Sequence, residues 1–138
     1  MYTVFQVSTE RIGGNKLDKY ELEVINALQK LNIPAHIRGY EFIKSAMNHL
    51  RKNPQLLYRL TTELYPEVAK EHGSSPSRVE RGIRTAIDPI GAIGVKDETV
   101  FQVLRRSGPF TNGEFLATLR EAINVKMAVE GGAKKFGS

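Results

Sequence analysis

The chain lacks cysteine and tryptophan altogether, and only 8% of its 138 residues are aromatic. Without cysteine, a small secreted fold held by disulfides is excluded. No apolar run approaches the ~18 residues of a membrane span, and Met1–Val7 has neither the basic start nor the apolar core of a signal peptide. With 41% hydrophobic residues, the chain is also too apolar for a disordered tail. We therefore expect one soluble, cytoplasmic, globular domain.

Positive charge is in small excess: 20 lysines and arginines against 15 aspartates and glutamates leave a net charge of +5. The excess is local, because residues 38–60 carry five basic side chains and one acidic one, whereas residues 1–37 are neutral overall. A local excess favours one basic surface, which permits a nucleic-acid partner without requiring one. The candidates for this flanking basic patch are Arg38, Arg51, Lys52 and Arg59.

Motifs of the common enzyme classes are missing. His36, His49 and His72 have no metal-ligand spacing, and no cysteine accompanies them. The chain has no Gly-x-Ser-x-Gly, no P-loop and no dinucleotide-binding fingerprint after a strand. We expect no metal, no cofactor and no catalytic residue, and we predict that the protein is not an enzyme.

Apolar spacing and helix breakers predict an all-α, multi-helix domain with at most one short strand, over residues 4–7. The predicted helices cover 17–31, 39–52, 55–64, 65–71, 76–88, 98–106 and 111–130. Asp88 and Pro89 are expected to end one helix, and Gly131 and Gly132 to end the last. The domain organisation that follows is an extension over 1–16, a helical domain over 17–127 and a flexible tail over 128–138.

Residues 65–88 have the pattern of a helix-turn-helix. Ala69 is followed four residues later by Gly73, so a small residue allows close helix approach and a glycine accepts the positive φ of a turn. On a helical wheel, the polar face of the second helix carries three arginines and one glutamate. The opposite face is apolar and consists of Val79, Ile83, Ala86 and Ile87.

The polar face suits base recognition. Arg78, Glu80 and Arg81 occupy the first turns of the helix, which is the part of a recognition helix that meets base edges. Arginine donates bidentately to guanine, and glutamate accepts from the cytosine amino group. An ordinary solvated face with an i,i+4 pair between Glu80 and Arg84 explains the same spacing. Spacing alone does not decide between these two readings.

Four segments in order resemble the C-terminal effector domain of the stage-zero sporulation response regulator A of endospore-forming bacteria. They are Pro34–Tyr40, Leu64–Lys70, Ser77–Ile87 and Thr111–Phe115. The resemblance spans about residues 17–127 and implies an all-helical bacterial DNA-binding domain that regulates transcription in sporulation. It also implies a double-stranded DNA target with a short TCG-core box, contact with the sigma subunit of RNA polymerase and a homodimer on tandem sites.

The resemblance carries over to individual residues. It implies base reading on the Ser-Arg-x-Glu-Arg run, with Arg78 and Arg81 on guanines and Glu80 on cytosine. Phosphate contacts are expected at Ser77, Arg84 and the helix start at Ser75.

The chain departs from the family pattern in three places. About 16 residues precede the domain, so we expect no receiver domain and no dimerisation driven by phosphorylation. The stop at Asp88 and the altered connector to Thr111 lie near the family's sigma-contacting surface. Gly82 replaces a family alanine, at a cost of about 1 kcal/mol in helix propensity. The alternative function is a protein-interaction module that binds sigma factor or a regulator without specific DNA binding.

Overall fold

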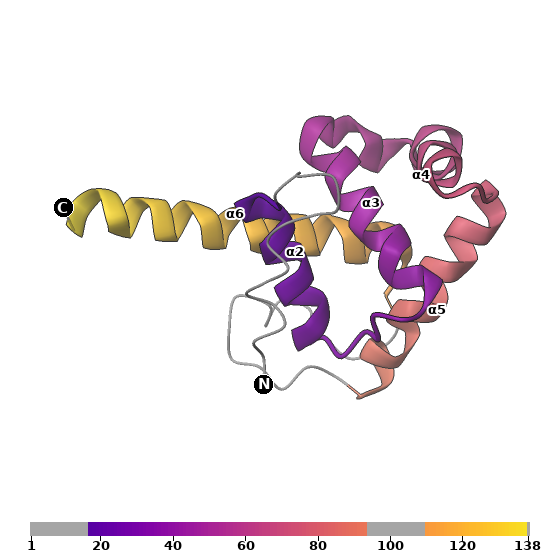
Figure 1. The fold of residues 1–138 in the computed structure, drawn as a ribbon, viewed down its shortest axis with the longest axis horizontal. Coiled ribbons are helices and arrows are strands. Elements are labelled where there is room, and N and C mark those ends of the chain that lie inside the picture. Colours follow the sequence, from indigo (N-terminus) through magenta and orange to yellow (C-terminus); the bar gives the residue numbers. More distant parts are fainter. Residues whose placement is uncertain (1–16, 94–109, 138) are drawn as a thin grey trace.

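The computed structural model describes residues 17–93 and 110–137, and all regular secondary structure in these residues is helical (Figure 1). The elements are α2 (Lys19–Lys30), α3 (Arg38–Lys52), η1 (Pro54–Tyr58), η2 (Leu60–Leu64), α4 (Tyr65–His72), α5 (Pro76–Ile93) and α6 (Asn112–Gly137). The all-α fold class is thereby confirmed. The predicted strand over 4–7 and the predicted helix over 98–106 lie outside the described residues.

Helix α3 is the centre of the core, because it contacts α2, α4, α5 and α6. Its apolar side chains recur every three or four residues and are almost completely buried. They are Phe42, Ile43, Ala46, Met47 and Leu50. The predicted helix over 39–52 is confirmed to within one residue.

The prediction of one continuous helix over 55–64 is wrong, because the structure has two short helical turns of other types there. Residues 54–58 form a 3-10 helix, and residues 60–64 form a π-helical turn that runs directly into α4. The side chain of Asn53 accepts a hydrogen bond from the Gln55 N–H at 3.2 Å, which starts the 3-10 helix in place of an α-helix. The irregular turns bury Leu56 and Leu64 and leave Tyr58 83% exposed.

The predicted end of a helix at Asp88 and Pro89 is also wrong, because α5 continues through Pro89 to Ile93. Proline removes one helical hydrogen bond, so the continuation needs a compensating contact. Ile90 supplies it, since this side chain is only 4% exposed and extends the buried stripe of Ile83 and Ile87. The expected connector over 89–94 is therefore helical as far as Ile93.

Helix α6 begins where the sequence predicts and ends later. A capping box starts it: the Glu114 N–H donates to the Thr111 Oγ1 and the Thr111 N–H to the Glu114 Oε1, each at 3.0 Å. The expected end at Gly131 and Gly132 is wrong, because the helix continues to Gly137. The flexible tail over 128–138 stays a prediction. Two glycines lower helix propensity without blocking the backbone hydrogen bonds.

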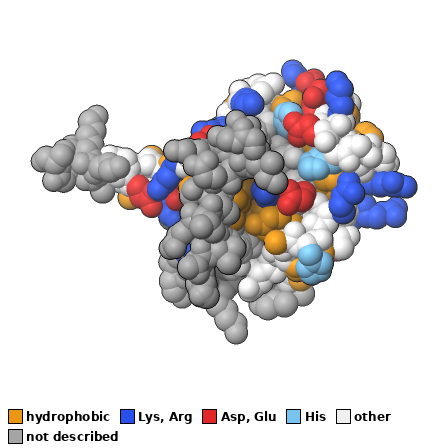
Figure 2. Space-filling model, in the orientation of Figure 1, with side chains coloured by type: hydrophobic (Ala, Val, Ile, Leu, Met, Phe, Trp, Pro, Cys, Tyr) orange, Lys and Arg blue, Asp and Glu red, His pale blue; other side chains and the backbone are white. Residues whose placement is uncertain are grey.

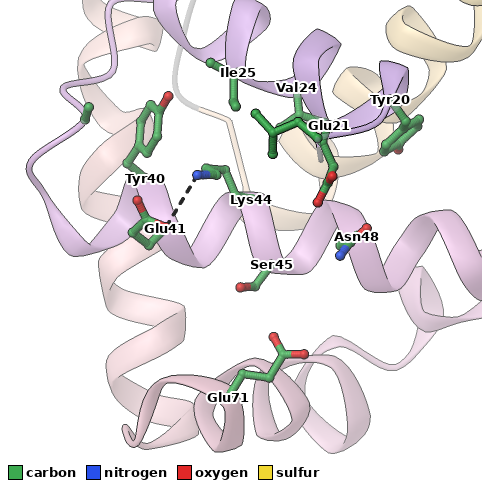
Figure 3. A pocket seen from close by; sticks show the side chains of 12 residues that line it. Tyr20, Glu21, Val24, Ile25, Tyr40, Glu41, Lys44, Ser45, Asn48 and Glu71 are labelled. Carbon is green, nitrogen blue, oxygen red and sulfur yellow. Dashed lines mark ion pairs between the residues drawn. The ribbon is translucent and has the colours of Figure 1, made fainter. Parts of the chain in front are cut away.

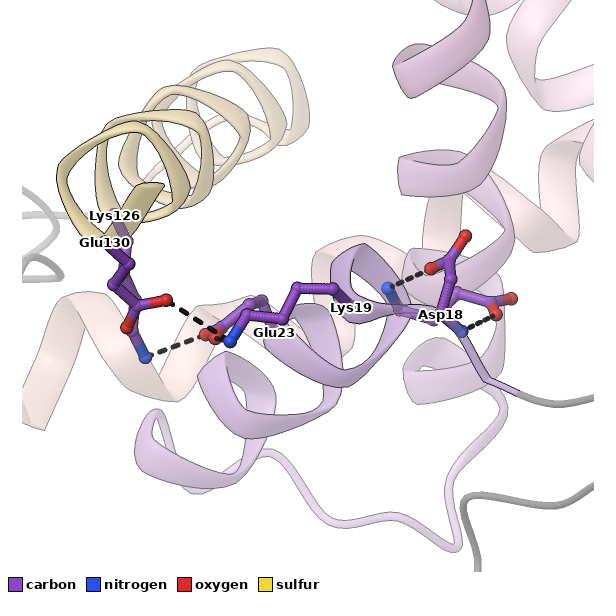
Figure 4. Close-up of polar contacts among 6 residues, drawn as sticks. Asp18, Lys19, Glu23, Lys126 and Glu130 are labelled. Atoms are coloured by element: carbon purple, nitrogen blue, oxygen red, sulfur yellow. Dashed lines mark hydrogen bonds and ion pairs between the residues drawn. The ribbon is translucent and has the colours of Figure 1, made fainter. Parts of the chain in front are cut away.

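Ion pairs attach the later part of α6 to α2 (Figure 4). The Lys126 Nζ lies 2.8 Å from the carboxylate of Glu23, whose side chain is only 6% exposed. Lys19 bridges the same carboxylate at 3.7 Å and Glu130 at 3.3 Å. Beyond these contacts α6 extends away from the other helices (Figure 1). Among the described residues, no helix is both long and apolar enough to cross a membrane.

Candidate nucleic-acid interface

A three-residue turn joins α4 to α5. Gly73 ends α4 with φ 59° and ψ 39°, the left-handed conformation that the sequence predicted for it. The Ser74 N–H donates to the carbonyl oxygen of Ala69 at 2.9 Å, which closes the end of α4 with the long-range bond of a Schellman motif. The left-handed conformation of Gly73 therefore ends the first helix of the helix-turn-helix and starts its turn.

The first turn of α5 is capped by Ser75. Its Oγ accepts a hydrogen bond from the Arg78 N–H at 3.3 Å, and its carbonyl oxygen accepts one from the Val79 N–H at 3.0 Å. Ser75 thus uses its acceptor on the helix and keeps its hydroxyl proton for an outside acceptor. Ser77 lies exposed in the same turn. Both residues stand where helix N–H groups and the helix dipole favour an anion.

Helix α5 separates its two faces as the helical wheel predicts. Val79, Ile83 and Ile87 are fully buried, and Ala86 is 4% exposed. Arg78, Arg81 and Arg84 are exposed on the other face. The basic side chains at the right margin of the space-filling view gather over the first turns of α5 (Figure 2).

Two glycines set the crossing of α3 and α5. A Cβ built on Gly39 would overlap the carbonyl oxygen of Gly82 and come within 2.8 Å of the Ala86 Cβ. A Cβ on Gly82 would lie 2.8 Å from the Cδ2 of the Phe42 ring. Gly82 is therefore a contact residue, and its low helix propensity accompanies a close approach of two helix backbones.

The close crossing brings Arg38, at the start of α3, next to α5. Arg38, Arg78 and Arg81 line a hollow of about 420 Å³ together with residues of the turn and of both helices. The Arg38 guanidinium lies 5.1 Å from the centre of the Phe42 ring, and its Nη2 donates to the His72 carbonyl oxygen at 3.4 Å. Three arginines line this one hollow, so it is the candidate anion site of the structure.

Arg78 and Arg81 differ from their neighbours in their pairing. Within 17–93 and 110–137, neither guanidinium has a hydrogen bond or an ion pair. The Nη1 of Arg84, by contrast, lies 2.7 Å from the Oε2 of Glu80, in the i,i+4 pair that the sequence also allowed. Arg78 and Arg81 are therefore exposed without a partner in this part of the chain, whereas Glu80 and Arg84 hold each other through one oxygen and one nitrogen.

The four residues of the predicted flanking patch do not form one patch. Arg38 joins the face of α5, whereas Arg51 and Lys52 lie at the other end of α3, about 20 Å away by the rise per residue. Arg51 pairs with Asp18 and stacks 4.6 Å from the centre of the Tyr20 ring. Arg59 lies outside α3 altogether, and it pairs with Glu63 at 3.4 Å.

A larger hollow, of about 620 Å³, lies on the α2 side of α3 (Figure 3). Its lining includes Lys44, which pairs with Glu41 at 3.6 Å. It also includes Glu71, whose Oε2 lies 2.9 Å from the His49 Nε2. None of the arginines of the α5 face lines this hollow, so it is separate from the anion site.

Two residues that support the α5 face were not identified from the sequence. The Asn112 Nδ2 donates to the Tyr65 hydroxyl at 3.1 Å and to the Glu80 carbonyl oxygen at 3.0 Å. Burial raises the pKa of the Tyr65 phenol, whose oxygen accepts the hydrogen bond from the amide. Asn112 lies inside the capping box, and the sequence predicted only the start of a helix there.

The comparison with known families agrees with the geometry. Residues 24–123 match the family model described as "Sporulation initiation factor Spo0A C terminal". The match includes α3, α4 and α5 completely and reaches into α6, so it contains the whole helix-turn-helix. The domain of this family is a helical DNA-binding domain, and the resemblance inferred from the sequence motifs is confirmed. The chain belongs to the family of C-terminal domains of sporulation initiation factor Spo0A.

Proposed function

We propose that the protein is a sequence-specific, double-stranded DNA-binding transcription regulator and that α5 is its recognition helix. One observation carries this proposal. Two exposed guanidinium groups without partners in the described residues, those of Arg78 and Arg81, stand together on the first turns of a helix that follows a helix-turn-helix turn. This is the part of a recognition helix that enters the major groove.

The base contacts follow from the chemistry of the side chains. Arg78 and Arg81 each present a fork of donors that matches the O6 and N7 acceptors of guanine. Glu80 accepts from the amino group of cytosine, because its pair with Arg84 uses the Oε2 and leaves the Oε1 for this contact. A TCG-core box supplies guanine and cytosine on both strands, so all three side chains have a base to read.

Phosphate contacts surround these base contacts. Ser75 and Ser77 lie at the helix start, where N–H groups and the dipole favour a phosphate. Arg38 adds a cation beside the same turn, and Arg84 adds one on the other side of Glu80. Such contacts set the register of the helix on DNA, and base contacts supply the specificity.

Selection from a pool of random duplexes with the purified chain tests this function. We expect enriched sequences to contain a TCG core, and we expect a duplex with that core to compete better than its scrambled version at moderate salt. Binding to a duplex with two tandem boxes, compared with a duplex with one box, tests whether the protein forms a homodimer on DNA. A binding assay with the sigma subunit of RNA polymerase tests whether the protein contacts that subunit. No enrichment, together with binding to a protein partner, would support an interaction module instead.

The Glu80→Gln substitution is predicted to weaken the choice of base. Glutamine keeps the length of the side chain and can donate as well as accept, so discrimination at the cytosine is expected to fall by about 1–3 kcal/mol. Competition among duplexes that vary only this base pair measures the change. Glu63→Gln is the matched control, because Glu63 also pairs with an arginine four residues away but lies outside α5. Unchanged discrimination in Glu80→Gln would contradict the assignment of Glu80 to a base.

A further inference from the structure

The side chain of Asn112 joins three helices at one point. Asn112 is the first residue of α6 and only 7% exposed. Its Nδ2 donates to the hydroxyl of Tyr65, the first residue of α4, and to the carbonyl oxygen of Glu80, in the second turn of α5. One amide group therefore connects both helices of the helix-turn-helix to the start of α6.

This connection is directional, whereas the apolar contacts of α5 are not. Burial of Val79, Ile83 and Ile87 holds α5 against the core, but apolar burial depends on area and little on angle. A hydrogen bond has a preferred distance and angle, so the bond to the Glu80 carbonyl oxygen selects one rotation of α5 about its axis. Arg78 and Arg81 lie within two residues of Glu80 on the same helix, so the rotation also places their side chains.

The amide is itself held in place. Thr111 and Glu114 fix the backbone on both sides of Asn112 through the capping box. The Oδ1 of Asn112 is buried and has no hydrogen-bond partner among the described residues. An apolar side chain of similar size would avoid burying this oxygen but would lose both hydrogen bonds, so the connection to α4 and α5 is what asparagine contributes at this position.

We propose that Asn112 is a positioning residue for DNA recognition, which sets the rotation of α5 so that Arg78 and Arg81 meet base edges. The inference rests on the proposed function. Recognition groups need to be held within about 0.5 Å and 10–20° of their productive geometry, a tolerance that nonspecific contact with phosphates does not require. Loss of the amide is therefore expected to lower specific binding more than nonspecific binding.

The Asn112→Leu substitution tests this role, because leucine has a similar size and removes both hydrogen bonds. At temperatures well below unfolding, we expect affinity for a TCG-core duplex to fall about tenfold. Affinity for the scrambled duplex should stay within about twofold. Ile123→Val is the matched control, since it trims the core side of the same helix and leaves both bonds; there the ratio of the two affinities should not change. Equal weakening on both duplexes, or an unchanged preference, would overturn the proposal.

A second variant keeps the test informative if Asn112→Leu does not fold. Tyr65→Phe keeps the ring of Tyr65 and removes only the bond between its hydroxyl and Asn112. We expect a smaller loss on the TCG-core duplex than with Asn112→Leu, and again none on the scrambled duplex. A Tyr65→Phe protein with wild-type preference for the box would count against the positioning role.

Two outcomes separate this inference from the proposed function. If the unsubstituted protein binds both duplexes equally, the proposed function fails, and the positioning role fails with it. If it prefers the TCG-core duplex and the substituted proteins keep that preference, only the role of Asn112 is overturned. Amide NMR spectra without DNA give a further readout: Asn112→Leu is expected to shift the signals of residues 77–84 and to leave those of α2 unchanged.

Discussion

Replacing Gly39 with alanine is expected to lower the free energy of unfolding by about 3 kcal/mol, because the new methyl group has no room. It would overlap the Gly82 carbonyl oxygen and lie 2.8 Å from the Ala86 Cβ. The carbonyl belongs to the backbone of α5, so relief requires the two helices to move apart. Urea unfolding followed by circular dichroism measures the change.

Gly131→Ala is the matched control for this prediction. Gly131 lies inside α6 with nothing within 4 Å of a built Cβ, so the same substitution is expected to stabilise the protein by up to about 1 kcal/mol. The change in the free energy of unfolding for Gly82→Ala should fall between those of Gly39→Ala and Gly131→Ala, because its Cβ meets the edge of the Phe42 ring rather than a backbone atom. A Gly39→Ala protein as stable as the unsubstituted chain would contradict the close crossing of α3 and α5.

Arg78→Ala is expected to weaken binding to a TCG-core duplex by about 1–3 kcal/mol and to relax the preference at one base. The arginine has no partner to lose among the described residues, so the substitution should leave the stability of the domain almost unchanged. Competition gel shifts with the box-containing and scrambled duplexes measure both effects. The scrambled duplex should lose only the contribution of one positive charge.

Lys52→Ala provides the control for charge. Lys52 is an exposed cation at the end of α3 farthest from Arg38, so removing it lowers the net charge by the same amount without touching the α5 face. We expect the ratio of specific to nonspecific binding to stay constant in this variant. If Arg78→Ala weakens both duplexes equally, base reading by Arg78 is contradicted.

The helices that were predicted well are those whose own periodicity determines which face is buried. The stripe of Val79, Ile83 and Ile87 needs only a helical repeat to be recognised, and its burial is confirmed. The errors at Pro89 and at Gly131 have a different origin. Local propensity opposed the helix at both places. At Pro89 the burial of Ile90 outweighed it, whereas at Gly131 the helix continues because glycine keeps the backbone hydrogen bonds.

The candidate site divides in the same way. Arg78 and Arg81 could be found from the sequence because they share one face of one helix. The selection of Arg38 from four basic candidates depends on the crossing of α3 and α5, which a single sequence does not reveal. The contacts of Asn112 could not be predicted for a similar reason, since its two hydrogen-bond acceptors lie 32 and 47 residues away along the chain.

The ion pair between Glu80 and Arg84 has a consequence for the entropy of binding. It uses only the Oε2 of Glu80 and the Nη1 of Arg84, so each side chain keeps further acceptors or donors while it is paired. Under the proposed function, the pair holds Glu80 in one orientation before a cytosine amino group arrives, and Arg84 contacts a phosphate with its remaining donors. Two side chains that are ordered in advance lose less rotamer freedom when DNA binds.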